Sequence, residues 1–177
     1  MSKKLFVNIA SLGLLQLANY VFPFLTVPYL SRVLSTSHYG LILFSLSFTT
    51  YFAILCDYGF GLTGTKAVAT NANQPEQLNR LVSNITVIKS ALFVFSLILN
   101  LIIVFSYGQF REYWFIYAIN IFTLINSIFF PTWFFQGMER MKYITLVQVA
   151  VRSLAVVLIL CIVKHDSDYY LWPVINL

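Results

Sequence analysis

Five long apolar runs occupy most of this chain, at residues 5–30, 39–60, 85–107, 113–135 and 143–163. An α-helix needs about 20 mostly apolar residues to cross a hydrocarbon core roughly 30 Å thick, at about 1.5 Å per residue. A sixth run, at residues 169–177, begins and ends within a few residues. Only 10% of the residues are charged, too few to cover a soluble fold. The sequence therefore predicts an all-α, polytopic membrane helix bundle with five complete transmembrane helices and a truncated sixth.

We expect residues 1–177 to form a single transmembrane domain. The first run is too long for a cleaved signal peptide, so it is interpreted as a retained helix. The abrupt end of the sixth run suggests that the chain is a fragment of a longer protein. The one long connection, residues 61–84, is expected to hold a Gly-rich exit from the second run and a short amphipathic helix after Pro75.

The basic residues are unevenly divided between the two ends of these runs. Cytoplasmic loops of membrane proteins are enriched in Lys and Arg. A cytoplasmic N-terminus places seven basic residues inside and three outside, with one more, Arg152, within the fifth run. The net charge of +5 is thus explained by topology, and a nucleic-acid partner is not expected. The inner set is Lys3, Lys4, Lys66, Arg80, Lys89, Arg140 and Lys142, and the outer set is Arg32, Arg111 and Lys164.

Four of the runs carry a polar stripe along one helical face, at about 100° per residue. Single polar residues commonly hydrogen-bond between helices as packing contacts. Four coincident stripes together with charged residues favour a polar cavity instead. The stripes are Asn8, Ser11, Asn19, Pro23 and Thr26 in the first run; Thr86, Lys89, Ser96 and Asn100 in the third; Asn120, Thr123, Ser127 and Pro131 in the fourth; and Gln148, Arg152 and Ser153 in the fifth.

Arg152 lies near the middle of the fifth run, where a charge costs about 2.5–3.5 kcal/mol to insert. Such residues usually face a cavity or a partner and mark a substrate or ion path. The planar guanidinium suits a phosphate or carboxylate, so an anionic ligand is the natural hypothesis. The alternative is an internal salt bridge that only holds helices together.

Asp57 is the only acid within a run. It is interpreted as a partner of Arg152 or Lys89, as a proton-coupling group, or as a helix-end residue that faces water. Lys89 and Arg32 lie near the ends of their runs, where long basic side chains reach the membrane surface. Lys66 follows a Gly-rich turn, which is weak evidence by itself.

No enzyme motif or metal-ligand spacing is recognisable, so neither catalysis nor a cofactor is expected. His38 and His165 lie in outer loops without a clustered set of ligands. Cys56 and Cys161 are predicted to lie near opposite ends of the membrane, too far apart for a disulfide. Both are interpreted as small core residues. Pro23, Pro28 and Pro131 each remove a backbone donor and are either hinges or tolerated kinks.

Four segments of the chain resemble O-antigen and polysaccharide-repeat flippases of the Wzx type. In order they are NYVFPFLTVPYLSRVL at 19–34, HYG at 38–40, DYGFGLTGTK at 57–66 and PTWFFQGMERMK at 131–142. The resemblance implies a multidrug/oligosaccharidyl-lipid/polysaccharide exporter fold, in which two six-helix lobes enclose a central cavity and this chain is the N-terminal lobe.

The same resemblance implies a transporter of the bacterial cytoplasmic (inner) membrane that moves an undecaprenyl-diphosphate-linked oligosaccharide between leaflets, for O-antigen or capsule synthesis. The implied partners are that lipid-linked substrate, the bilayer, and the polysaccharide polymerase and chain-length machinery. Alternatives are a cation-coupled drug exporter of the same superfamily, a membrane-embedded glycan polymerase, or an inactive fragment. The residues expected to contact substrate are Arg152, Lys89, Arg32, Asp57, Lys66, Asn19, Asn100 and Gln148.

Overall fold

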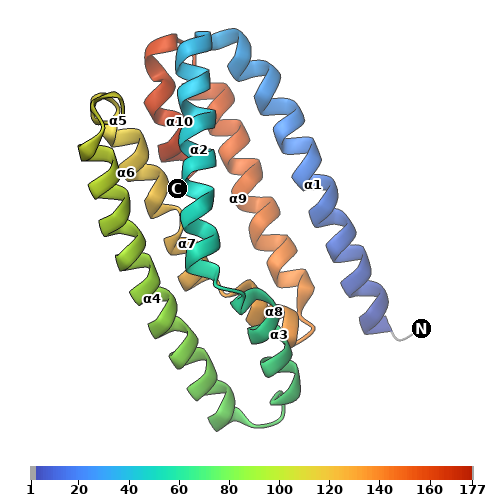
Figure 1. The fold of residues 1–177 in the computed structure, drawn as a ribbon. Helices are drawn as coiled ribbons and strands as arrows, with labels where there is room; N and C mark the ends of the chain where they lie inside the picture. Colours follow the sequence, from blue (N-terminus) through green and yellow to red (C-terminus); the bar gives the residue numbers. More distant parts are fainter. Residues whose placement is uncertain (1–2, 177) are drawn as a thin grey trace. The chain divides into compact units, whose positions relative to one another are not determined.

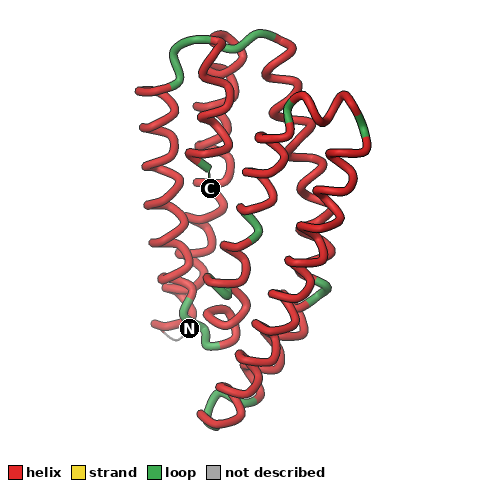
Figure 2. The backbone as a smooth tube through the Cα atoms, turned by 90° about the vertical axis from the view of Figure 1, so that its left-hand side faces the viewer, coloured by secondary structure: helices red, strands yellow, loops and turns green. Residues whose placement is uncertain are grey.

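The computed structural model describes residues 3–176, and within that range every regular element is a helix (Figures 1 and 2). The predicted all-α class is therefore confirmed. The elements are α1 (Lys3–Val33), α2 (Thr36–Asp57), α3 (Phe60–Thr70), α4 (Pro75–Ser106), α5 (Gly108–Glu112), α6 (Trp114–Phe122), α7 (Ile125–Phe129), α8 (Thr132–Gly137), α9 (Met141–Ile162), the 3₁₀ helix η1 (Asp166–Tyr170) and α10 (Leu171–Ile175).

Five segments of the described chain are long and apolar enough to cross a membrane, as the sequence predicts. Their outer surfaces are strongly apolar. Phe24 on α1, for example, is 78% exposed, and Phe129 on α7 is 82% exposed. A soluble monomer rarely exposes such large apolar areas, whereas lipid covers them without cost. The five segments are Phe6–Val33, Thr36–Thr70, Pro75–Ser106, Trp114–Gly137 and Met141–Ile162.

The helices group into two compact units. The first unit joins the described residues up to Leu41 with Glu139–Asn176, and the second unit is Ile42–Met138. Because the boundary falls within α2, the first residues of that helix belong to the first unit and the rest to the second.

In the first unit, α1 and α9 run parallel to each other. Thr145 on α9 donates a hydrogen bond of 2.9 Å to the Ser11 carbonyl on α1, and Tyr29 on α1 donates one of 2.7 Å to the Val163 carbonyl. Both pairs are separated by 134 residues, so the register is constant along the helices. Pro23 and Pro28 lie within α1 without ending it.

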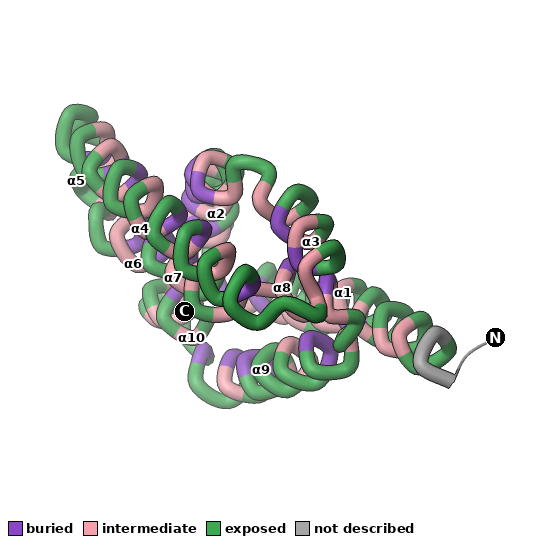
Figure 3. Tube along the Cα trace, turned by 90° about the horizontal axis from the view of Figure 1, so that it is seen from below, coloured by how far each residue is buried: buried purple, intermediate pink, exposed green. Residues whose placement is uncertain are grey.

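In the second unit, two apolar clusters hold the helices together. One cluster is Phe52 and Cys56 from α2 with Ile121 from α6 and Leu124 just beyond it. The other is Val68 from α3, Leu78 and Ile85 from α4, and Trp133 from α8. Buried residues, drawn purple in Figure 3, therefore occur on α2, α3, α4, α6 and α8, whereas α5 and α7 have none.

The connection at residues 61–84 is more regular than the sequence suggests. The expected Gly-rich exit is a helix, α3, which follows left-handed residues Tyr58 (φ 42°) and Gly59 (φ 81°). The expected separate helix after Pro75 is instead the first part of α4, which continues unbroken to Ser106. Proline is favoured in the first turn of a helix because its missing N–H would have no partner there, so Pro75 begins α4.

The fourth apolar run is not one helix but three, α6, α7 and α8 (Figure 1). At the first break the backbone forms i→i+3 bonds, with Thr123 N–H on the Asn120 carbonyl and Leu124 N–H on the Ile121 carbonyl. At the second break, Phe130 precedes Pro131 and adopts φ −114°, ψ 81°, because proline disfavours a helical residue before it.

Candidate functional site

Arg152 projects from the middle of α9 and is exposed, on a helix that crosses the membrane. Its Nη1 donates a hydrogen bond to Oδ1 of Asn19 on α1. An amide carries no charge, so this bond orients the guanidinium without neutralising it. The arrangement differs from the internal salt bridge that was the alternative interpretation of Arg152.

Asn19 offers more than its side chain at this position. Pro23 has no backbone N–H, so the usual i→i−4 bond to the Asn19 carbonyl cannot form. Proline inside a membrane-spanning helix is tolerated where neighbouring groups satisfy the backbone it frees. A main-chain acceptor and a side-chain acceptor therefore lie on one residue beside the guanidinium.

Gln148 lies four residues before Arg152 on α9 and is partly buried. Residues four apart share a helical face. Thr145 and its bond to the Ser11 carbonyl lie one turn further along the same pair of helices. The first unit thus carries a polar strip along α1 and α9, and of the eight predicted substrate residues it brings together Arg152, Asn19 and Gln148.

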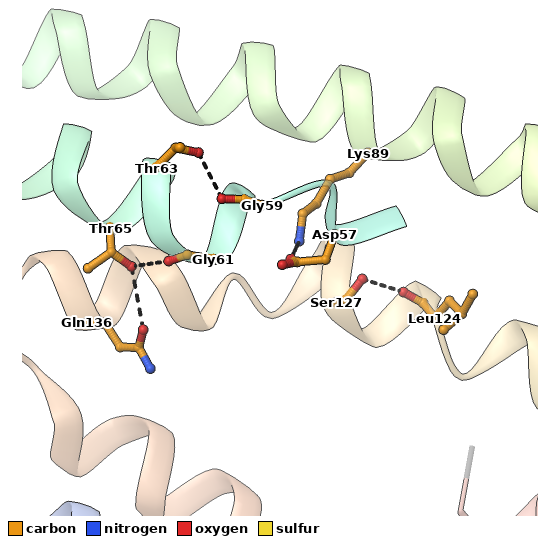
Figure 4. A network of polar contacts seen from close by, with 9 residues as sticks. All are labelled: Asp57, Gly59, Gly61, Thr63, Thr65, Lys89, Leu124, Ser127 and Gln136. Atoms are coloured by element: carbon orange, nitrogen blue, oxygen red, sulfur yellow. Dashed lines mark hydrogen bonds and ion pairs between the residues drawn. The ribbon is translucent and has the colours of Figure 1, made fainter. Parts of the chain in front are cut away.

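Lys89 and Asp57 form an ion pair in the second unit, with Nζ 2.9 Å from Oδ1 (Figure 4). The Lys89 side chain is 4% exposed and that of Asp57 is 49% exposed. The Lys89 side chain is therefore buried, and its ammonium pairs with the last residue of α2. Of the alternatives for Asp57, pairing with Lys89 is the one that the structure contains.

The Asp57–Lys89 pair lies next to the tightly packed start of α3. A Cβ added at Gly61 would approach Oδ2 of Asp57 to 3.2 Å. Thr65, one turn further, donates to the Gly61 carbonyl at 2.6 Å and lies 3.5 Å from Oε1 of Gln136 on α8 (Figure 4). The Gly-rich motif therefore serves close packing around the acid.

The other three predicted residues lie apart from these groups. Arg32 is exposed in the last turn of α1, 13 residues and about 20 Å along the helix from Asn19. Lys66 is exposed on α3. Asn100 is 1% exposed on α4 and lies inside the packing of the second unit rather than on an open surface.

A polar cluster that the sequence did not reveal joins the start of α2 to η1 in the first unit. Nδ1 of His38 lies 2.9 Å from Oδ2 of Asp166, and the His38 ring stacks on Tyr169 with centroids 4.1 Å apart. The Ser35 backbone N–H bonds Oδ1 of Asp166 at 2.6 Å. This N–H and then His38 lower the pKa of Asp166, because both stabilise its charged form.

Cys56 is buried and Cys161 is exposed, and both are free thiols. The interpretation of Cys161 as a core residue is therefore wrong, whereas that of Cys56 is confirmed. Among residues 3–176, no group of three His, Cys, Asp or Glu side chains is placed to hold a metal ion.

Comparison with known proteins connects this geometry to a family. The chain is 29% identical over 161 residues to a protein of Escherichia coli (strain K12) that carries the name O-antigen transporter, and 31% identical over 163 residues to one of the same name from Shigella dysenteriae. Each match covers 91% of this chain but only 39% and 40% of the two relatives, so the chain spans about two fifths of their length.

No solved structure matches the chain significantly. The family described as polysaccharide biosynthesis protein matches it over residues 5–177, nearly from end to end. With five segments long and apolar enough to cross a membrane and this match, the chain belongs to the polysaccharide biosynthesis protein family.

Proposed function

We propose that the chain is part of a transporter that moves an undecaprenyl-diphosphate-linked oligosaccharide from the inner to the outer leaflet of the bacterial cytoplasmic membrane. Its family and its relatives named as O-antigen transporters support this proposal. The polysaccharide repeat is too polar to cross a hydrocarbon layer unaided, because each unpaired polar group costs several kcal/mol there.

The observation that carries the proposal is Arg152 with its neutral partner. A guanidinium within a membrane-spanning helix is expensive unless it has a function or a counter-charge. Asn19 supplies orientation but no counter-charge. A diphosphate supplies two groups of acceptor oxygens that match the donor fork of arginine. The guanidinium is therefore proposed to hold the diphosphate during transfer.

The remaining polar groups are proposed to contact other parts of the substrate. Gln148 and Asn19 border Arg152 and are suited to hydrogen-bond sugar hydroxyls or phosphate oxygens. The lipid tail remains in the bilayer, against the apolar outer surface. Arg32 at one end of α1 and Lys66 on α3 are proposed to attract the anionic head group at the membrane surfaces.

Lys89 has a different role in this proposal from the one that the sequence suggests. Its charge is already matched by Asp57, so it contacts substrate only if phosphate replaces the carboxylate. The ion pair also speaks against a cation-coupled drug exporter, since the carboxylate of Asp57 is already occupied by a lysine. Asn100 is proposed to contribute to packing within the second unit rather than to bind substrate.

The decisive experiment substitutes Arg152 in the natural reading frame that encodes this chain, in cells whose surface polysaccharide depends on it. Arg152→Ala should abolish surface polysaccharide while the protein stays in the membrane at its normal level. Arg152→Lys, which keeps the charge but not the fork, should retain only part of the export.

Arg111→Ala is the matched control, because Arg111 is exposed on α5 outside the spans and should be dispensable. Lipid-linked oligosaccharide should accumulate on the cytoplasmic leaflet of the Arg152→Ala cells only. Normal export by Arg152→Ala would remove this residue from the mechanism.

A further inference from the structure

Two buried amide side chains in the second unit have polar atoms without a hydrogen-bond partner in the protein. Neither Nδ2 nor Oδ1 of Asn100 has one, and neither does Oδ1 of Asn120. Both residues are 1% exposed. Buried polar groups are almost always hydrogen-bonded, and leaving one unsatisfied is costly, so each of these atoms requires an explanation.

The two amides lie at similar depth on neighbouring helices. α4 and α6 are antiparallel and are joined through α5 at the outer end of the second unit (Figures 1 and 2). Asn100 lies six residues before the end of α4, and Asn120 lies six residues after the start of α6. At about 1.5 Å per residue, each is about 9 Å from the α5 end of its helix.

Other buried polar groups lie on the same helices and on α2. Nδ2 of Asn120 donates to Oγ of Ser45 on α2 at 2.8 Å, and that hydroxyl donates to the Ile42 carbonyl at 2.8 Å. One turn from Asn100 on α4, Oγ of Ser96 lies 3.4 Å from the Cys56 thiol. Ser45 and Ser96 are both fully buried, so polar side chains from three helices lie inside an apolar core.

The backbone is irregular at the same place, which is an independent observation. The first break of the fourth span begins at Asn120, whose carbonyl accepts from both the Thr123 N–H and the Thr123 hydroxyl at 3.1 and 2.6 Å. Breaks in membrane helices are tolerated where neighbouring groups or ordered water satisfy the backbone. Water inserted beside the i→i−4 ladder is a known cause of such breaks.

We propose that Asn100 and Asn120 bind internal water between α4 and α6, at the break that ends α6. The ligand must both accept from Nδ2 and donate to the two Oδ1 atoms. Water does both. A bare cation would satisfy only the oxygens and would face the N–H donors of Asn100, so the pattern of unpaired atoms selects water over an ion.

This water site gives the fourth span a hinge. A water exchanges hydrogen-bond partners without leaving a buried amide unpaired, so α6 can tilt against α4 at a cost lower than that of breaking a direct amide–amide bond. The inference concerns the interior of the second unit and does not depend on which substrate is transported.

Water-edited solid-state NMR of the 177-residue chain in lipid bilayers tests the site directly. With ¹⁵N-labelled Asn and Val, the side-chain amide of Asn100 should receive water magnetisation as early as that of Asn73, which lies in an exposed turn. The backbone amide of Val104, buried one turn away on α4, is the dry reference. Asn100→Gln identifies the Asn100 signal while keeping an amide at the site.

Asn120→Leu should then reduce the transfer from water to Asn100, because it removes one of the groups that hold the water. Asn79→Leu, at an exposed position of α4, should leave it unchanged. If Asn120→Leu does not fold, Asn120→Ser replaces it, and the wild-type spectrum remains sufficient by itself. An Asn100 amide as slow as Val104, or a direct bond between the two amides, overturns the proposal.

Discussion

Three polar side chains within the spans differ in their partners, and the partners explain their different roles. Arg152 contacts a neutral amide, Lys89 contacts a carboxylate, and the Asn100 side chain has no hydrogen-bond partner among the described residues. Only the first keeps an uncompensated charge on an exposed surface. Exposure and partner together, rather than charge alone, therefore separate a binding residue from a structural one.

The Asp57–Lys89 pair should be structural. Asp57→Ala leaves a buried ammonium without its counter-charge, and we expect a loss of about 1–3 kcal/mol in the free energy of unfolding. The value lies below that of a fully buried pair because half of the Asp57 side chain is exposed and screened. Thermal unfolding in detergent, followed by tryptophan fluorescence, measures the loss.

The double variant Asp57→Ala with Lys89→Met is the control for this prediction. It removes both charges and should recover most of the lost stability, because an apolar chain of similar length fills the same space. Equal stability of the single and double variants would show that the pair contributes nothing.

Sequence reasoning reaches only part of this residue-level pattern. Pairing of Asp57 with Lys89 was one of the alternatives, but nothing in the helical periodicity distinguishes it from pairing with Arg152. The Arg152–Asn19 bond joins residues 133 positions apart, and periodicity within one helix does not show which other helix it faces. Asn100 is part of a recognisable stripe, whereas its complete burial depends on α2 and α6.

At the scale of single elements, hydropathy finds the spans but not their interruptions. The fourth run is apolar throughout, and only Pro131 signals one of its two breaks. The other break has no proline or glycine and depends on the Thr123 hydroxyl bonding the Asn120 carbonyl. Conversely, Pro23 and Pro28 suggest breaks in α1 where the structure has none.

Close approach of α3 and α8 depends on two glycines without side chains. A Cβ added at Gly137 would lie 2.6 Å from Cβ of Val68 and 2.7 Å from the Thr65 carbonyl, and one added at Gly64 would lie 2.9 Å from the Trp133 ring. Contacts this short force backbone atoms apart. Gly137→Ala should therefore cost about 1–3 kcal/mol in the free energy of unfolding, measured by thermal unfolding in detergent.

Gly108→Ala provides the comparison, since a Cβ there meets nothing within 4 Å and the change should be nearly neutral. Adding Val68→Ala to Gly137→Ala relieves the side-chain clash but not the contact with the Thr65 carbonyl, so partial recovery is expected. Full stability of Gly137→Ala alone would contradict the packing described for α3 and α8.

At the scale of the whole molecule, the sequence predicts the class and the number of spans because both follow from hydrophobicity and length alone. The division into two units that separates α2 into two parts is not visible in the sequence, since it depends on contacts between distant segments. The orientation proposed from the basic residues makes the next test possible.

With a cytoplasmic N-terminus, α5 lies on the external side of the membrane and the turn between α3 and α4 lies on the cytoplasmic side. In a background without native thiols (Cys56→Ala and Cys161→Ala), Gln109→Cys should react with a membrane-impermeant maleimide in intact cells, and Asn73→Cys should not. Both positions are exposed, so both should react after permeabilisation. The reverse pattern would invert the topology, and with it the direction of transport that we propose.

The pairing of α1 with α9 has a consequence for biogenesis. Thr145 is synthesised 134 residues after Ser11, a delay on the order of 10 s at ordinary rates of translation. The residues of α1, with Asn19 and the carbonyl freed by Pro23, are therefore synthesised before the guanidinium of Arg152 leaves the ribosome. Arg152, the residue that is most costly to insert, is thus synthesised after the acceptor to which it donates.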